Sequence, residues 1–306
     1  MGKKCVIWGM GKGYEEILNQ IRFEIYKENM EVIAVVCKPE DKYCGQRDGF
    51  PIISKEEMGG LDFEYVIISS YLFYREIQKE AIELGIEVNK IVNGQVFKIP
   101  LFDFGLYAEL IENPVTILTD DCWGGFVYHY LGLIFSSPLI NTFWNKSEYA
   151  RFIQDPLFYL GTELVMVREG DLRAGLCPLG KLGRDGKEVQ IQFLHNVDFY
   201  EAKQQWDRRK KRINPDNLFV KMGFGMPDKN VKEYIEAFDN CKYNKILFYN
   251  GDEEIEGKLG TDRFLWYEKK DSLVDDPHYE VYMRRFYYET VDVFKLLTGR
   301  KNYARE

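Results

Sequence analysis

The sequence lacks an excess of positive charge. Its 41 lysines and arginines face 49 aspartates and glutamates, giving a net charge of −8 and a pI near 5.2. Proteins that bind nucleic acids draw most of their affinity from basic contacts to phosphates. The balance therefore argues against a nucleic-acid partner, and against docking on an anionic membrane surface.

Paired cysteines and long apolar runs are missing as well. The six cysteines are widely spaced without a C-x-x-C pair, which excludes a zinc knuckle or a disulfide framework, and we predict no metal site. The longest near-apolar segment, residues 131–144, is too short to span a bilayer. The N-terminus continues into a predicted strand without a signal-peptide core. We expect a soluble, cytoplasmic protein with no integral membrane segment.

The 306 residues suffice for one large or two medium domains, at 45% hydrophobic and 15% aromatic content. The composition changes after Lys98-Ile99-Pro100. We predict a first domain over residues 1–98 and a second over residues 99–306.

The first domain opens with a strand, a glycine-rich turn and a helix. Residues 5–8 and 32–36 are the strands, and the turn contains Gly9, Gly11 and Gly13. This pattern predicts a βαβ unit whose turn binds phosphate. It departs from the dinucleotide fingerprint, because Tyr14 replaces the third glycine and Cys37-Lys38-Pro39 replaces the acidic residue after the second strand. NAD binding is therefore not favoured.

A short edge element is predicted at residues 50–54, and further strands at residues 65–69 and 90–92. The whole series resembles the small Rossmann-like domain attached to many bacterial sugar-modifying and polysaccharide-synthesis proteins. That resemblance implies a nucleotide- or nucleotide-sugar-binding domain. The alternative is an empty scaffold that only packs against its neighbour.

The second domain is organised around residues 115–144. A strand at 115–118 meets a polar turn, and a helix-like apolar pattern starts at Phe126. The turn holds Asp120, Asp121, Cys122, Trp123, Gly124 and Gly125. A turn of this kind places side chains and backbone N–H groups at the carboxyl edge of a parallel sheet, where α/β folds bind ligands. An ordinary turn relieved by its glycines is the alternative.

More strands are predicted at residues 163–167, 189–193, 219–222 and 246–249, with a Gly-rich break at 178–183. The fold class predicted for the chain is α/β, with two Rossmann-like three-layer domains and mainly parallel sheets. In this arrangement His195 follows a parallel strand and reaches the same edge as Cys122.

A helix predicted over residues 198–213 carries basic side chains. Arg209 falls on its apolar stripe and needs a partner there, because an unpaired buried charge is costly. Arg208, Arg209 and Arg212 are candidates for binding a phosphate or carboxylate. The alternative is a solvated basic helix whose cations favour its own C-terminal end.

Several motifs occur in a fixed order: TDDCWGG at 119–125, SSP at 136–138, CPLG at 177–180, FLHN at 193–196 and EA…RRKKRIN at 201–214. Together they resemble a bacterial family of unknown function associated with exopolysaccharide biosynthesis. The resemblance implies a process rather than a reaction. The motifs add Ser136, Ser137 and Asn196 to the candidate ligand-binding residues.

The sharpest chemical hypothesis is a transferase that moves an acyl group to or from a sugar. Cys122, before a helix N-terminus, would be the nucleophile and His195 the general base. The N–H groups of Trp123, Gly124 and Gly125 would form an oxyanion hole. Asp120 and Asp121 oppose this, because like charge disfavours a thiolate.

Two other hypotheses stay open. In a glycosyltransferase-like or nucleotide-sugar-binding protein, Asp120 or Asp121 would act as base or hydroxyl ligand, and the arginines would bind a diphosphate. In a non-catalytic assembly protein, a sugar nucleotide would bind as a signal. We expect a small-molecule or sugar ligand, with coenzyme A or a nucleotide-sugar as the candidates. Aromatic residues of the last predicted helix suit a homodimer contact: Tyr279, Tyr282, Phe286 and Tyr287.

Overall fold

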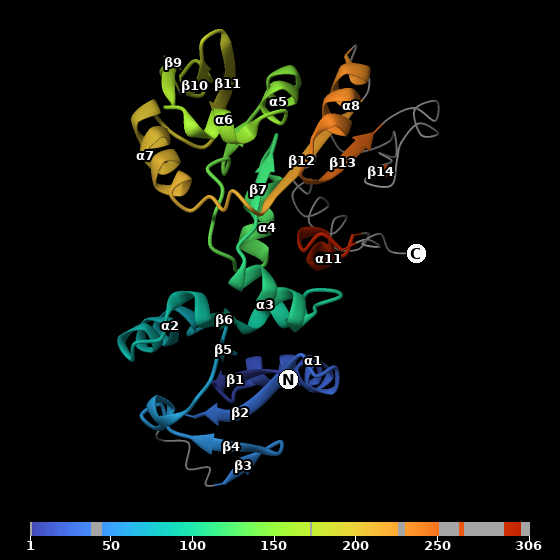
Figure 1. The fold of residues 1–306 in the computed structure, drawn as a ribbon. Coiled ribbons are helices and arrows are strands. Elements are labelled where there is room, and N and C mark those ends of the chain that lie inside the picture. Colours follow the sequence, from blue (N-terminus) through green and yellow to red (C-terminus); the bar gives the residue numbers. More distant parts are fainter. Residues whose placement is uncertain are drawn as a thin grey trace. The chain divides into compact units, whose positions relative to one another are not determined.

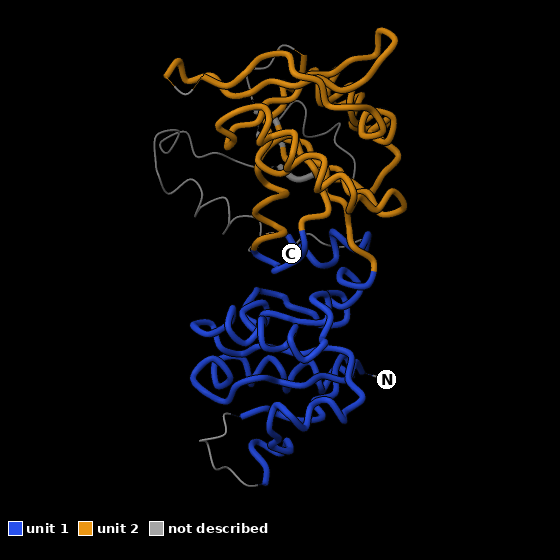
Figure 2. Tube along the Cα trace, turned by 90° about the vertical axis from the view of Figure 1, so that its left-hand side faces the viewer, with its two compact units in different colours: residues 1–112, 130–134, 284–306 blue, residues 113–129, 135–283 orange. Residues whose placement is uncertain are grey.

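The protein, as a computed structural model, is described here over residues 2–37, 45–171, 173–225, 230–250, 263–265 and 291–300. It is a mixed α/β structure with three sheets in the described residues (Figure 1). The chain divides into two compact units (Figure 2). Unit 1 comprises residues 1–112, 130–134 and 284–306, and unit 2 comprises residues 113–129 and 135–283.

Unit 1 is built on a six-stranded, largely parallel sheet with the order β3-β4-β2-β1-β5-β6. Only the short β3 runs antiparallel to its neighbour. The strands are β1 (Lys3–Trp8), β2 (Met30–Val36), β3 (Gln46–Arg47), β4 (Phe50–Ile53), β5 (Tyr65–Ile68) and β6 (Ile91–Asn93). The predicted parallel βαβ unit is confirmed, since β1 pairs in parallel with β2 on one side and with β5 on the other.

The described α-helices of unit 1 are α1 (Lys12–Tyr26), α2 (Tyr74–Glu83), α3 (Phe104–Glu112) and α11 (Val293–Leu297). Its 3-10 helices are η1 (Glu57–Gly60), η2 (Val88–Lys90) and η3 (Gly94–Lys98). The ring of Phe294 in α11 packs edge-on against Phe102 and Tyr107 at 5.4 and 6.4 Å between centroids. This aromatic contact explains why the C-terminal segment belongs to unit 1.

A buried carboxylate joins α1 to α3. Glu24 is fully buried and accepts hydrogen bonds from Asn29 Nδ2 at 2.7 Å and from the Phe104 N–H at 2.9 Å. Asp103 accepts from the Leu106 N–H at 2.9 Å and pairs with Lys27. Helix α3 is thereby held within unit 1, whose first segment ends at residue 112.

Unit 2 contains a four-stranded parallel sheet with the order β14-β13-β12-β7. Its strands are β7 (Thr116–Thr119), β12 (Leu218–Gly225), β13 (Asn244–Asn250) and β14 (Arg263–Leu265). The strands predicted at 115–118, 219–222 and 246–249 all lie in it. Their carboxyl ends share one edge, because all the pairings are parallel.

The other strands of unit 2 form a separate antiparallel sheet, so a second domain of mainly parallel sheet holds only in part. Its order is β8-β11-β10-β9, with β8 (Thr142–Phe143), β9 (Val165–Arg168), β10 (Leu179–Arg184) and β11 (Lys187–Phe193). The Gly-rich segment expected as a break is strand β10. Gly180 has no room for a Cβ, which would lie 2.7 Å from Leu164, and Gly183 has a φ of +103°. These glycines are needed inside the hairpin, not between strands.

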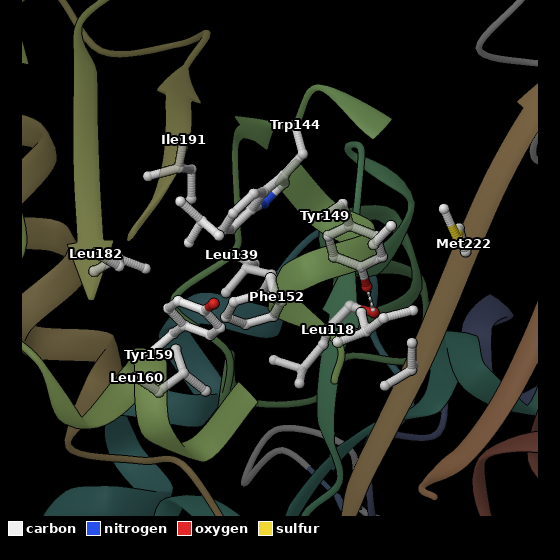
Figure 3. Packing of buried hydrophobic residues seen from close by; sticks show 14 of the residues in the cluster. Leu118, Leu139, Trp144, Tyr149, Phe152, Tyr159, Leu160, Leu182, Ile191 and Met222 are labelled. Atoms are coloured by element: carbon white, nitrogen blue, oxygen red, sulfur yellow. Dashed lines mark hydrogen bonds between the residues drawn. The ribbon is translucent and has the colours of Figure 1, made fainter. Parts of the chain in front are cut away.

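One hydrophobic core connects the two sheets of unit 2. Figure 3 shows Trp144, Tyr149 and Phe152 within the cluster that includes Ile191 of β11 and Met222 of β12. The Tyr149 hydroxyl lies 2.8 Å from the carbonyl oxygen of Leu118 and 3.0 Å from that of Lys221, and so bridges β7 and β12.

The helices of unit 2 are α4 (Trp123–Tyr130), α5 (Lys146–Phe152), α6 (Pro156–Gly161), α7 (Phe199–Lys210) and α8 (Val231–Asn240). Helix α5 contacts both β11 and α8 (Figure 1). Within the described part of the chain, every helix is too short or too polar to cross a membrane. The aromatic residues considered for a homodimer contact, at 279, 282, 286 and 287, lie outside the described residues.

The role of Glu24 predicts a matched pair of substitutions on α1. Glu24→Gln removes the charge that its donors bind, and we expect unit 1 to lose about 2 kcal/mol of unfolding free energy. Glu15→Gln, at a side chain that is 62% exposed, should change it by less than about 0.5 kcal/mol. Urea denaturation, with hydrogen exchange of the β1 and β5 amides reporting on unit 1, measures both. Equal losses would contradict the role of Glu24.

Candidate active site at the carboxyl edge of the unit 2 sheet

The turn between β7 and α4 is closed by its own polar side chains. Thr119 Oγ1 donates to the carbonyl oxygen of Asp121 at 2.7 Å, and Asp121 Oδ1 accepts the N–H of Trp123 at 3.0 Å. Helix α4 begins there, since the Phe126 N–H donates to the Cys122 carbonyl at 3.2 Å. Cys122 therefore occupies the N-cap position of the helix, and Asp121 precedes it. The Trp123 N–H predicted for the oxyanion hole already has a partner in Asp121.

Gly124 is closely packed. A Cβ at this position would lie 3.1 to 3.2 Å from side-chain atoms of Thr119 and Ile117, so these side chains would have to shift to accept one. Gly125 has more space, with its nearest contact at 3.4 Å from Ile140. The N–H groups of both glycines belong to the first helical turn, where N–H groups have no acceptor inside the helix.

Asp120 is fully buried beneath this turn and bound by two lysines. Lys221 of β12, itself only 1% exposed, donates to Asp120 Oδ1 at 3.1 Å and also pairs with Asp121. Lys146 at the start of α5 pairs with Asp120 Oδ2, which also accepts the Gly223 N–H at 3.0 Å. The cluster thus ties β7, β12 and α5 together at one point.

The charges of this cluster balance. Burial alone would raise the pKa of Asp120. The positive charges of Lys146 and Lys221, with the hydrogen bonds from Lys146 and the Gly223 N–H, outweigh that effect and hold the pKa below its usual value. Two carboxylates and two ammonium groups therefore leave no net negative charge beside Cys122 from this cluster. The repulsion expected from Asp120 and Asp121 is offset by neighbours that the sequence analysis did not identify.

Cys122 and His195 lie together. The half-buried Cys122 Sγ is 3.8 Å from Nε2 of the exposed His195. His195 reaches this edge from the antiparallel sheet, two residues after β11 ends, and not from a parallel strand as expected. A thiol and an imidazole at this separation can exchange a proton after a small movement.

Asn196 is the next residue and is 5% exposed. Its side-chain nitrogen Nδ2 is buried and has no hydrogen-bond partner among the residues that the structure describes. A buried amide donor without an acceptor is costly, so this group is suited to a bound water or ligand oxygen.

Other predicted ligand residues lie at the opposite end of β7. Ser136 Oγ donates to the Val115 carbonyl at 2.7 Å, and Ser137 Oγ accepts the Leu139 N–H at 3.2 Å. Both hydroxyls are buried and used inside the fold. The structure therefore does not bring them to Cys122.

Two of the three candidate arginines in α7 and just after it donate to main-chain carbonyls. Arg209 is buried as predicted, and Nη1 donates to the Ile140 carbonyl at 3.1 Å; burial lowers its pKa to about 10. Arg212 donates to the Phe135 carbonyl at 3.0 Å, near the amino end of β7. Arg208 is exposed. Arg212 therefore lies away from the carboxyl edge where Asp120 and Asp121 sit.

The three glycines of the first predicted site are in unit 1. Gly9, Gly11 and Gly13 line a cavity at the carboxyl edge of its sheet. In the described ranges, no three His, Cys, Asp or Glu side chains come together as metal ligands.

Lys146 and Lys221 are the functional residues that sequence reasoning missed. Lys221 carried a usable signal, because a lysine inside the apolar run Phe219–Met222 must find a buried partner. The partner itself could not be identified from the sequence. Asp120 is about 100 residues from Lys221 and becomes its neighbour only because β7 pairs with β12.

The lysine–aspartate cluster predicts a pH-dependent effect of Asp120→Asn. At neutral pH the variant leaves the buried Lys221 and the partly exposed Lys146 short of a carboxylate, and we expect unit 2 to lose about 3 kcal/mol. The folded-state pKa of Asp120 lies below its unfolded value of about 3.9. Its contribution is therefore complete above that value and is lost as the pH falls through the folded-state pKa.

Urea denaturation of wild type and variant between pH 7 and pH 3 measures this difference, which should narrow below about pH 4. Asp185→Asn is the matched control, because that side chain is 90% exposed and its φ of +57° suits asparagine. A difference that stayed constant down to pH 3 would contradict the assignment.

Comparison with known proteins agrees with a boundary between an N-terminal and a larger C-terminal part. Residues 1–92 match a family described as C2185-like, N-terminal. An uncharacterized protein of Haemophilus influenzae is 30% identical over 146 residues, which covers 47% of this chain and 65% of that protein. Residues 93–298, more than half of the chain and including the Cys122 site, match a second family. The chain therefore belongs to the family described as Domain of unknown function (DUF1919).

Proposed function

We propose that unit 2 is a transferase that carries an acyl group on Cys122 with His195 as its general base. The observation that carries the proposal is the 3.8 Å separation of Cys122 Sγ and His195 Nε2 at the carboxyl edge of a parallel sheet. The two residues are 73 positions apart and come from different sheets. In enzymes, an adjacent histidine that accepts the thiol proton is a common way to activate a cysteine nucleophile.

The surroundings of Cys122 support a reactive thiol. Its turn precedes the N-terminus of α4, where the helix dipole favours negative charge. Lys146 and Lys221 offset Asp120 and Asp121, so the carboxylates do not oppose a thiolate. The sulfur of Cys122 is half-buried and the imidazole of His195 is exposed, so the pair is accessible from solvent on the imidazole side.

The proposed reaction has two steps, acylation of Cys122 and transfer of the acyl group to an acceptor hydroxyl. His195 takes the thiol proton, Cys122 Sγ bonds to the donor carbonyl carbon, and the donor's leaving group departs with that proton, leaving a thioester. An acceptor hydroxyl then gives its proton to His195, its oxygen bonds to the same carbon, and the C–S bond breaks, restoring the thiol. The N–H groups of Gly124 and Gly125 and the Asn196 amide are candidate donors to the carbonyl oxygen.

The wider setting is also proposed. A thioester such as acyl-coenzyme A suits the donor, because its leaving group is a thiol. A sugar hydroxyl as acceptor rests on the resemblance of the 119–125 and 193–196 motifs to proteins associated with exopolysaccharide biosynthesis. A cytoplasmic location, with the largely parallel sheet of unit 1 as a Rossmann-like domain, completes the proposal.

The proposal predicts a covalent intermediate. Wild type mixed with acetyl-coenzyme A should gain one acetyl group on the Cys122 peptide, detected by mass spectrometry and removed by hydroxylamine. Cys122→Ala should gain none. Cys177→Ala, at another half-buried thiol, should behave as wild type. His195→Gln should lower the rate by about 100-fold or more.

Asn196→Leu adds a second diagnostic. Removing a buried donor that lacks a partner among the described residues should leave stability unchanged or slightly raised, while acylation slows. In the acetylation experiment, equal labelling of wild type and Cys122→Ala would refute the assignment of Cys122 as the nucleophile.

A further inference from the structure

Unit 1 contains a large cavity where its strand order changes direction. The cavity has a volume of about 940 Å³ and lies beyond the carboxyl ends of β1, β2 and β5, lined by Trp8, Val36 and Ser69 among others. The chain leaves β1 for β2 on one side and places β5 on the other. Open α/β sheets bind ligands at such a point, and the volume suits a nucleotide-sized molecule.

Glycine is not present for the same reason at each position of the 9–13 turn. Gly9 has a φ of +109°, and a Cβ there would lie 2.8 Å from Ser69 Oγ. A Cβ on Gly13 would lie 2.1 Å from the Ser69 carbonyl oxygen. The fold therefore requires glycine at both positions, because the turn passes against the end of β5.

Gly11 is different. Its φ is −79°, which any residue adopts, and a Cβ there would meet nothing within 4 Å. Gly11 is nevertheless the N-terminal cap of α1, where serine, aspartate or asparagine is preferred, and α1 has no side-chain cap. The missing side chain keeps the surface beside the helix N-terminus open toward the cavity.

The first turn of α1 offers hydrogen-bond donors at that surface. The N–H groups of Tyr14 and Glu15 donate to the Gly11 carbonyl, whereas those of Lys12 and Gly13 have no acceptor inside the helix. Gln95 also lines the cavity, and its amide nitrogen has no hydrogen-bond partner among the described residues. Such donors bind phosphate oxygens.

The charged side chains of the lining nearly cancel. Lys98 pairs with Glu16, and Lys55 pairs with Glu80 at 2.8 Å. The side chain of Lys12 is 88% exposed, and its carboxylate neighbour, Glu16, is 3.9 Å away. Lys12 is therefore the lining cation best placed to turn toward a ligand phosphate.

An apolar wall completes the cavity. Tyr71, Leu72 and Phe73, between β5 and α2, are 71%, 79% and 52% exposed and line the cavity together. Adjacent exposed aromatic rings are suited to stacking against a planar base. The end of β2 carries Cys37 instead of the carboxylate that holds the adenosine ribose of NAD.

We propose that this cavity binds a nucleoside diphosphate group, with the phosphates on the 11–13 backbone and the base against Tyr71 and Phe73. The group has two chemical sources, a nucleoside diphosphate sugar or coenzyme A. The site goes beyond the transfer chemistry at Cys122 and does not depend on it.

The test is isothermal titration of the full-length protein with ADP, UDP, UDP-glucose, coenzyme A and NAD. Gly11→Ser gives α1 the side-chain cap that it lacks, so thermal stability should stay equal or rise. The same side chain occupies the phosphate cradle and should weaken binding at least tenfold. Gly60→Ser is the matched control, at an exposed glycine of the same unit whose Cβ also meets nothing within 4 Å.

Tyr71→Ala, at an exposed side chain, is a second variant that leaves folding intact and should weaken binding about tenfold through lost stacking. Cys122→Ala should bind as wild type, so failure of the acyl-transfer proposal and failure of this one are distinguishable. Tighter binding of UDP-glucose or of coenzyme A identifies the source. Absence of binding to wild type or unchanged affinity in Gly11→Ser would overturn the proposal. NAD as the tightest ligand would overturn the assignment of the group to a nucleoside diphosphate sugar or coenzyme A.

Discussion

The interaction on which unit 2 depends is the buried contact of Asp120 with Lys221 and Lys146. It fixes the end of β7 against β12 and the start of α5, and through Lys221 it also holds Asp121, whose carboxylate accepts the Trp123 N–H at the start of α4. Cys122 lies between Asp121 and the first residue of α4. The position of the thiol and the electrical neutrality of its surroundings therefore have the same cause, an ion cluster in which two lysines balance two carboxylates.

His195 reaches Cys122 through packing rather than through strand order. It follows a strand of the antiparallel sheet, and the core around Trp144, Tyr149 and Phe152 holds that sheet on the parallel one. The 3.8 Å separation of sulfur and nitrogen is thus a property of the whole core of unit 2. Substitutions in this core should alter the chemistry even where they touch neither residue.

The sequence was informative where a feature is local and less so where it depends on distant partners. Hydrophobic runs located β1, β2, β5, β7, β12 and β13, and glycines with a polar turn located both candidate sites. Strand β10 escaped detection, because its glycines serve hairpin packing and resembled a break. Ser136 belongs to a sequence motif, but its hydroxyl donates a hydrogen bond to a main-chain carbonyl within the fold. The partner of Lys221 is set by the pairing of β7 with β12, which hydrophobic periodicity alone does not specify.

The most direct test of the central claim, that His195 activates Cys122, is the rate of iodoacetamide alkylation of Cys122 at pH 7, followed by peptide mass spectrometry. The account predicts that His195→Gln slows alkylation of Cys122 at least fivefold while alkylation of Cys177 is unchanged, because the imidazole raises the thiolate population only at its neighbour. Equal rates at Cys122 in wild type and variant would show that the two side chains are adjacent without acting together, and would contradict the account.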